Sequence, residues 1–219
     1  MYKIALASRS VVLLAFLFLS ACASMQVARE VQSGRAALRV SNPKAAIPHF
    51  EEAARLNPAY ITDFTPLKIG IWTYIGRAQY EAGNTAKALE NLKRAKQQYP
   101  LDDHVASLYL GLAMTQNGGR SQAAKEIESG LRGLHTWLET LPGRSLEGRY
   151  WDPGSYLRRT MSETLIMLQE KEPDWKEIAE NVKWIGQKLD EEIEEVRKQR
   201  DRDAEDNGKQ DGGFSTGGP

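Results

Sequence analysis

The sequence contains few of the residues that carry out chemistry. Of its 219 residues one is a cysteine, Cys22, and three are histidines. His49, His104 and His135 are far apart and lack the ligand spacing of a zinc site. The sequence also has no glycine-rich phosphate loop and no Gly-x-Ser-x-Gly turn. We therefore expect no cofactor, no metal site, no catalytic residue and no small-molecule substrate, and predict that the protein is not an enzyme.

An excess of charge of either sign is missing as well. Lysine and arginine together number 29, as do aspartate and glutamate, so the formal net charge is zero. Without a basic excess, nucleic acid is not an expected partner. A single cysteine also excludes a disulfide framework. The fold must then be stabilised by packing, for which 41% hydrophobic residues are sufficient.

Long apolar runs are absent except at the N terminus. Lys3 and Arg9 precede an apolar run from Val11 to Leu19, and small residues follow up to Cys22. The run is shorter than the roughly 20 residues that span a bilayer. A charged start, a short apolar core and small residues are typical of a secretory signal. Cys22 is then either a chance residue after an ordinary cleaved signal or an attachment point.

Leu19-Ser20-Ala21-Cys22 resembles the lipobox of bacterial lipoproteins. The resemblance implies that residues 1–21 are a signal peptide, that Cys22 is lipidated, and that residues 22–26 form a short linker. Lipid chains of this kind anchor a protein to a membrane. Ala23 stands where lipoproteins of the inner membrane often have aspartate, so the resemblance implies an outer-membrane anchor that faces the periplasm.

Residues 72–100 have a regular pattern of large and small side chains. The motif positions are Trp72, Ile75, Gly76, Tyr80, Gly83, Ala88, Leu92, Ala95 and Pro100. This pattern resembles the tetratricopeptide repeat, a helical hairpin of about 34 residues. Matching offsets occur upstream at Gly34, Leu38, Ala46, Phe50, Ala53 and Pro58, and downstream at Leu110, Gly111, Gly118, Ala123 and Ile127.

The resemblance predicts an all-α solenoid of three repeats within residues 27–137. We expect the repeats at residues 27–60, 69–102 and 104–137, with the extra residues ITDFTPLK between the first two. Gly76 and Ala88 would let the helices of one hairpin approach closely. Asp102 and Asp103 lie where one repeat meets the next, and we interpret them as helix caps rather than as an acidic pair.

Beyond residue 137 the repeat pattern is lost, and residues 138–202 are expected to form helices that cap the solenoid. Asp174 is a predicted N-cap of a long helix that ends near Arg202. Its apolar residues form one stripe, and its acidic cluster from Glu191 to Glu195 is interpreted as a solvated face, with a docking role as the alternative. Residues 203–219 are polar and glycine-rich, and are predicted to be disordered.

In tetratricopeptide arrays the first helix of each hairpin lines a concave groove that binds partners. The resemblance places Arg35, Leu38, Arg39, Thr73, Arg77, Tyr80, Glu81, Leu108, Leu112, Thr115 and Gln116 there. This groove suits an extended or helical peptide with an acidic part and an apolar part, because the arginines can pair with carboxylates. Leu108 and Leu112 are either free for the partner or covered by the C-terminal helix.

One loop adds a second candidate surface. Arg149, Tyr150 and Trp151 either form a recognition surface or plug the loop onto the core. The expected function is that of a membrane-anchored periplasmic scaffold or adaptor, which binds a protein partner during assembly of a cell-envelope complex. The alternative is a cell-wall accessory protein that binds glycan or regulates a peptidoglycan hydrolase.

Overall fold

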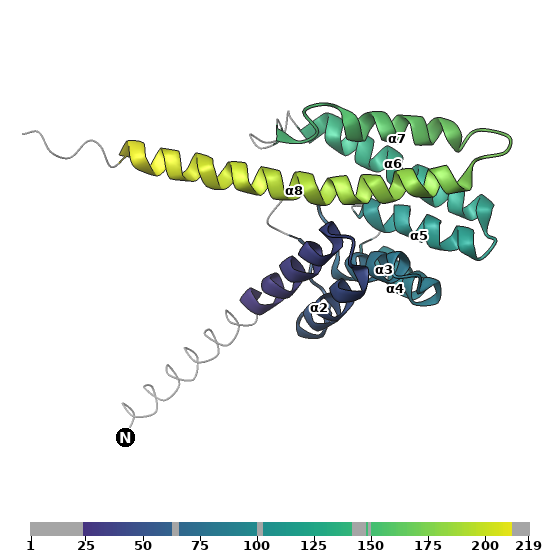
Figure 1. The fold of residues 1–219 in the computed structure, drawn as a ribbon, viewed down its shortest axis with the longest axis horizontal. Helices are drawn as coiled ribbons and strands as arrows, with labels where there is room; N and C mark the ends of the chain where they lie inside the picture. Colours follow the sequence, from purple (N-terminus) through teal and green to yellow (C-terminus); the bar gives the residue numbers. More distant parts are fainter. Residues whose placement is uncertain (1–23, 63–65, 100–102, 142–147, 149, 212–219) are drawn as a thin grey trace, which may run out of the picture.

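The computed structural model describes residues 24–62, 66–99, 103–141, 148 and 150–211, and the side chains up to residue 205 (Figure 1). These residues form helices and no strand, apart from an isolated bridge between Ile61 and Gly70. The predicted all-α fold class is therefore confirmed. Cys22, the predicted signal peptide over residues 1–21 and Arg149 lie outside the described residues.

The helices follow one another in a series of antiparallel hairpins. A first helix spans residues 24–39; it is followed by α2 (Pro43–Leu56), α3 (Ile71–Glu81), α4 (Thr85–Gln98), α5 (His104–Gln116), α6 (Arg120–Thr140), α7 (Tyr156–Met167) and α8 (Trp175–Asp211). Each helix from α2 to α8 packs against the next, α3 also packs against α5, and α5 also packs against α8. This packing is consistent with a helical repeat solenoid.

Helical structure extends closer to Cys22 than expected. Residues 24–26 are already helical at the first described position, so the predicted linker over residues 22–26 is wrong for residues 24–26. Val27 and Val31 anchor this part of the helix, because both are buried one turn apart on the same face.

Glycines allow the two helices of each hairpin to approach closely. A Cβ atom added at any of three glycines would lie 2.5 Å from a side chain of the partner helix. The pairs are Gly34 with Phe50, Gly76 with Leu92, and Gly111 with Ile127. The three hairpins therefore share one register of contacts, and a side chain at these positions would overpack the interface.

Asp103 joins two successive hairpins. Its carboxylate accepts a hydrogen bond from Ala106 N at 3.0 Å, which caps α5, and others from Gly70 N at 2.8 Å and Thr73 Oγ1 at 2.5 Å at the start of α3. Burial raises the pKa of this carboxyl, against the opposing effect of these donors. The predicted capping role is confirmed for Asp103, whereas Asp102 lies outside the described residues.

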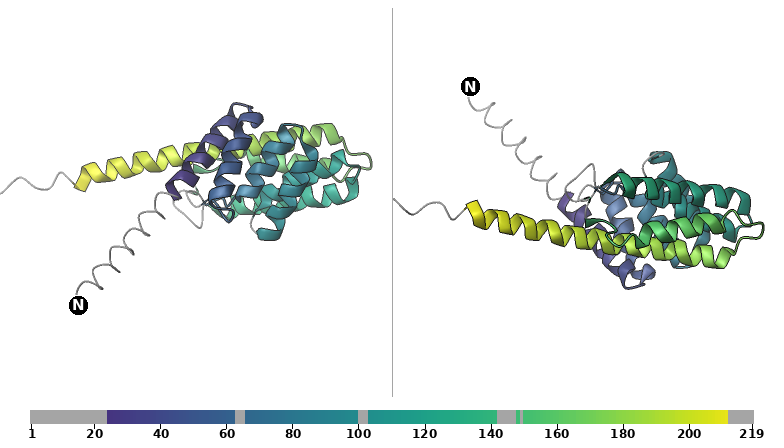
Figure 2. Two further views of the ribbon diagram at one scale, coloured as in Figure 1. Left: turned by 90° about the horizontal axis from the view of Figure 1, so that it is seen from below. Right: turned by 90° about the horizontal axis from the view of Figure 1, so that it is seen from above.

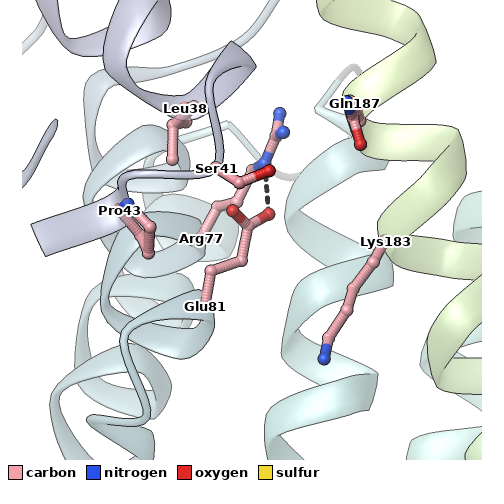
Figure 3. A pocket seen from close by; sticks show the side chains of 7 residues that line it. All are labelled: Leu38, Ser41, Pro43, Arg77, Glu81, Lys183 and Gln187. Atoms are coloured by element: carbon pink, nitrogen blue, oxygen red, sulfur yellow. Dashed lines mark hydrogen bonds and ion pairs between the residues drawn. The ribbon is translucent and has the colours of Figure 1, made fainter.

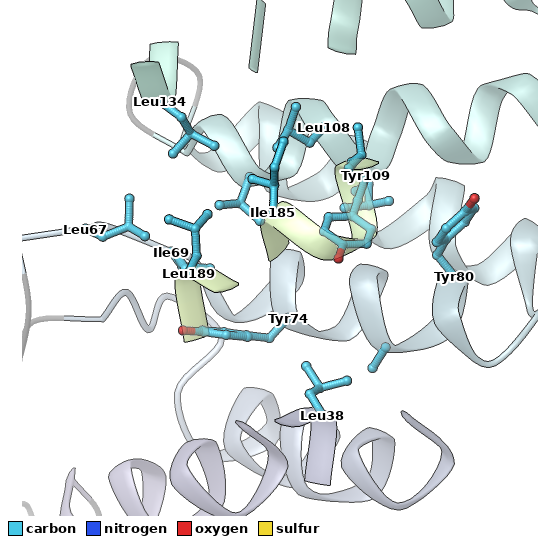
Figure 4. Close-up of a cluster of buried hydrophobic side chains, with 14 of the residues drawn as sticks. Leu38, Leu67, Ile69, Tyr74, Tyr80, Leu108, Tyr109, Leu134, Ile185 and Leu189 are labelled. Carbon is cyan, nitrogen blue, oxygen red and sulfur yellow. The ribbon is translucent and has the colours of Figure 1, made fainter. Parts of the chain in front are cut away.

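The insertion between the first two repeats contributes to the core. Thr62 Oγ1 donates to Leu67 O and accepts from Ile69 N, both at 2.9 Å, which fixes the part of the loop that the structure describes. Leu67 and Ile69 are each only 2% exposed and belong to the main hydrophobic cluster (Figure 4). This loop is thus an integral part of the packing.

Helix α8 is longer than predicted. Asp174 Oδ1 accepts from Lys176 N at 2.9 Å and from Glu177 N at 3.1 Å, which confirms the predicted N-cap. The helix continues to Asp211, so the prediction of disorder is wrong for residues 203–211. Asp203 accepts hydrogen bonds from Gln199 one turn before it and from Tyr150 OH, and these contacts extend the helix past Arg202.

The path of α8 brings the C-terminal region back to the first repeat. Figures 1 and 2 show α8 running lengthwise beside the hairpins, with its end projecting on the side where the first helix begins. Its stripe of apolar side chains is buried along this path: Ile178, Val182, Ile185, Leu189, Ile193 and Val196. The helix therefore covers the array along its length as well as closing its last repeat.

Candidate functional site

The predicted groove contains a buried ion cluster centred on α8. Asp190 of α8 lies between Arg35 of the first helix and Arg77 of α3. The distance from Asp190 Oδ2 to Arg77 Nη1 is 2.7 Å, and that from Asp190 Oδ1 to Arg35 Nε is 3.5 Å. The exposed side-chain fractions are 0% for Arg35, 4% for Arg77 and 1% for Asp190. Two of the arginines that were predicted to pair with a partner's carboxylates thus contact a carboxylate of the chain itself.

One turn further along α8, Glu194 repeats this arrangement. Its Oε1 lies 3.1 Å from Arg35 Nη1 and 3.4 Å from Arg39 Nη1, and it accepts a hydrogen bond from Gln32 at 3.1 Å. Burial acts to raise the pKa of Glu194, but the Gln32 hydrogen bond and the charge of Arg35 outweigh it and lower the pKa. Glu194 therefore stays ionised beside the arginines.

Arg77 also connects α8 to the neighbouring repeat helices. Its Nε donates to Glu81 Oε1 at 2.9 Å, and the same oxygen accepts from Tyr109 OH at 2.8 Å. The guanidinium carbon lies 5.4 Å from the centre of the Tyr109 ring, within cation–π range. Burial acts to lower the pKa of Arg77, but the charges of Asp190, Tyr109 and Glu81 together with the Glu81 hydrogen bond outweigh it and raise the pKa. The second and third hairpins and α8 are thus linked through the charged guanidinium of Arg77.

The apolar groove positions are buried rather than open. Leu38, Tyr80, Leu108 and Leu112 belong to the same cluster as residues of α8 such as Ile185 and Leu189 (Figure 4). At Gly186, an added Cβ would lie 2.3 Å from Tyr109 OH, so α8 approaches α5 closely. The prediction that these positions line an open groove is therefore wrong for Leu38 and Tyr80. For Leu108 and Leu112, the burial agrees with the alternative that the C-terminal helix covers them.

The remaining groove residues have other roles. Thr73 donates to Asp103, Thr115 donates to Leu112 O at 2.7 Å, and Gln116 accepts from Thr85 of α4. Thr115 is half-buried and Gln116 is exposed at the end of α5. These side chains do not join the ion cluster. Among the predicted groove positions, only Gln116 is exposed.

The acidic cluster of α8 is only partly solvated. Glu191 and Glu195 are exposed, whereas Glu192 and Glu194 are each 8% exposed. Glu192 accepts a hydrogen bond from Asp152 N at 3.3 Å, and burial raises its pKa. The interpretation as a solvated face is therefore wrong for Glu192 and Glu194, which bind parts of the chain far away in sequence.

The candidate recognition loop packs onto the core. Trp151 is 4% exposed and meets Trp137 edge to face, with the ring centres 4.9 Å apart. Asp152 is buried and accepts from Leu157 N at 2.9 Å, which caps α7 in a way that the sequence analysis missed. Tyr150 is half-buried with its hydroxyl on Asp203. For Trp151 the structure supports the plug rather than the recognition surface.

A cavity of about 240 Å³ lies between α3, α8 and the turn that joins the first helix to α2. Figure 3 shows Arg77 and Glu81 on one side of this cavity, and Lys183 and Gln187 of α8 on the other. Leu38, Ser41 and Pro43 complete the lining. Lys183 and Gln187 are exposed, so the cavity opens to solvent along the edge of α8.

No group of side chains suited to a metal ion occurs among the described residues. Within the same ranges, no helix combines the length and apolar character that crossing a bilayer requires. Comparisons of the chain with protein-family models, with curated proteins and with solved structures find no match.

The sequence contained a signal for the ion cluster. Arg35 and Arg39 are four residues apart in the first helix, and Asp190 and Glu194 are four residues apart in α8. Residues at this spacing lie on one face of a helix, so the two pairs present matching charges. Asp190 and Glu194 also each follow a residue of the apolar stripe, Leu189 and Ile193, which places them beside the buried face.

Proposed function

We propose that the protein is a membrane-anchored adaptor with tetratricopeptide-type repeats, which binds a protein partner in the assembly of a cell-envelope complex. Lipidation at Cys22 would hold it at the outer membrane, facing the periplasm. This part of the proposal is based on the residues Leu19-Ser20-Ala21-Cys22. Tethering would raise the effective concentration of the repeats toward other membrane-bound proteins.

The observation that carries the binding role is the way the repeats hold α8. An amphipathic helix lies along the predicted concave face, with apolar side chains in the core and Asp190 between Arg35 and Arg77. Helix-in-groove binding is a common mode of peptide recognition, in which an apolar face gives affinity and fixed polar contacts give specificity. The repeats therefore have the chemistry that such a partner requires.

Photo-crosslinking in cells tests this function. A photo-reactive residue at Gln187 would sample the open edge of the cavity, and the same residue at Lys93 on the exposed side of α4 serves as the control. We expect one envelope protein to be captured at Gln187 and not at Lys93. Its yield should fall when Lys183→Glu changes the charge at the cavity mouth.

Two results would contradict the proposal. Identical products at Gln187 and Lys93 would indicate unspecific contacts of an exposed surface. A specific product at Gln187 that is a glycan rather than a protein would favour the role in the cell wall.

A further inference from the structure

Helix α8 lies along the concave face, the face that Arg35, Arg39 and Arg77 line, in the manner of a bound peptide. Its contacts to the first helix and to α3 consist largely of charged pairs, from Asp190 to Arg35 and Arg77, and from Glu194 to Arg35 and Arg39. Beside these carboxylates, Leu189 and Ile193 enter the hydrophobic cluster. An apolar stripe with two carboxylates four residues apart is thus the pattern that this face recognises.

Buried ion pairs are a poor way to maximise stability. Taking charges out of water costs free energy, and replacing a buried pair by apolar residues of similar volume is often neutral or stabilising. Four of the charged side chains here, those of Arg35, Arg77, Asp190 and Glu194, are at most 10% exposed. Such a cluster discriminates in favour of a helix with matching carboxylates, because a helix without them would bury the charges of Arg35 and Arg77 without the ion pairs that Asp190 and Glu194 supply.

The connection before α8 allows the helix to move as a unit. Residues 168–174 join α7 to α8 outside any regular helix, and Gln169, Glu170, Lys171 and Glu172 are exposed. The open cavity beside Lys183 and Gln187 also leaves one edge of α8 exposed to solvent. A competing helix can therefore enter at this edge.

From these contacts we infer that the concave face is a binding site for an amphipathic helix of a partner protein, and that α8 is its intramolecular competitor. The partner helix carries two carboxylates four residues apart beside an apolar stripe. This inference rests on the proposed adaptor function and adds the chemical class of the partner and its regulation. Binding then requires release of α8, so the apparent affinity is reduced by the small fraction of molecules in which the face is free.

A peptide with the sequence of residues 174–202 is the probe. It carries a fluorophore, and its anisotropy reports binding to the full chain purified in detergent micelles. The wild-type chain is compared with Glu194→Ala, in which only the internal helix loses a carboxylate while the peptide keeps its own. We expect the apparent Kd to fall about tenfold in Glu194→Ala, because a weaker internal competitor leaves the face free more often.

Matched controls separate competition from unfolding. The chain variant Glu191→Ala changes the same residue type on the exposed side of α8 and should bind as the wild type does. A peptide carrying Asp190→Arg and Glu194→Arg should not bind. Glu194→Ala can lose helix content for reasons unrelated to the ion pairs. In that case Glu194→Gln, which keeps the volume of the side chain, takes its place and should also lower the apparent Kd.

Equal affinity of the peptide for the wild-type and Glu194→Ala chains would overturn the inference, as would equal binding of the charge-reversed peptide or no binding at all. These failures are distinct from a failure of the adaptor function. A protein captured at Gln187 in cells, together with no peptide exchange, would leave the adaptor function standing and show that the partner binds with α8 in place.

Discussion

Cys22 is the residue on which the proposed membrane attachment depends. We predict that Cys22→Ser abolishes lipidation, because serine lacks the thiol to which the lipid is joined. The precursor should then remain uncleaved, or the protein should leave the membrane fraction. Fractionation and intact-mass measurement of the lipid adduct check this outcome. A serine variant that stays in the membrane fraction with a cleaved signal would refute the role of Cys22 as the anchor.

Gly76 tests the shared register of the hairpins. A Cβ atom at this position would lie 2.5 Å from Leu92 Cγ and 3.2 Å from Leu92 N. The backbone of α4 is therefore close, and repacking of the side chain alone cannot create the space. We predict that Gly76→Leu lowers the free energy of unfolding by about 1–3 kcal/mol, the usual cost of overpacking. Urea denaturation measures the change.

The control for Gly76→Leu is Ala86→Leu. Ala86 is exposed in α4, so a leucine there adds the same kind of bulk to a helix without meeting the core. Its effect should stay within about 0.5 kcal/mol of the wild type. Equal losses of unfolding free energy in the two variants would mean that the close contact of α3 with α4 is not the reason why position 76 requires glycine.

Single elements of this fold were predictable from local patterns, but the position of α8 was not. The period of its apolar residues predicts a buried stripe, and Asp174 predicts where the helix begins. A stripe does not specify the surface that covers it. The decisive contacts, such as those of Arg35 with Asp190, join residues at opposite ends of the chain and depend on how the loops place α7 and α8. Asp152 was not recognised as the cap of α7 for a different reason: its contact is local, but it lies before Ser155, which occupies the N-cap position.

At the scale of α8, the ion cluster predicts a dependence of stability on pH. The pKa of Glu194 is lowered from its ordinary value of 4.5 in the folded protein. A carboxyl with a lowered folded pKa stabilises the fold above its unfolded pKa, and this contribution is lost as the pH falls through the folded pKa. The docking of α8 should therefore weaken below about pH 4.5.

The variant Glu194→Gln isolates this contribution. At pH 7 we expect its free energy of unfolding to be about 1.5–3 kcal/mol lower than that of the wild type, the range for a hydrogen bond to a charged group. The difference should shrink steadily from pH 5 to pH 3, and urea denaturation at several pH values measures it. All other side chains are common to both proteins, so the difference between them reports on position 194. A difference independent of pH would show that Glu194 acts through its shape rather than its charge.

At the scale of the whole molecule, α8 changes how a repeat array should unfold. In an open solenoid each repeat contacts only its neighbours, and unfolding can proceed repeat by repeat. Here α8 contacts the first helix through Arg35 and α5 at Tyr109, so it connects the first and third hairpins directly. These long-range contacts should couple the hairpins into one cooperative unit.

Leu189→Ala tests this coupling. Leu189 is 2% exposed in the cluster that α8 shares with the repeats, and truncation of a buried leucine costs about 2–5 kcal/mol. We predict that amide hydrogen exchange in the variant accelerates in residues 24–39 as well as in α8, because release of α8 removes the ion pairs of Arg35 with Asp190 and Glu194. Glu191→Ala, on the exposed side of the same helix, should leave both segments unchanged. Faster exchange confined to α8 would mean that the repeats are stable without it, and that α8 is an accessory helix rather than the element that joins the array.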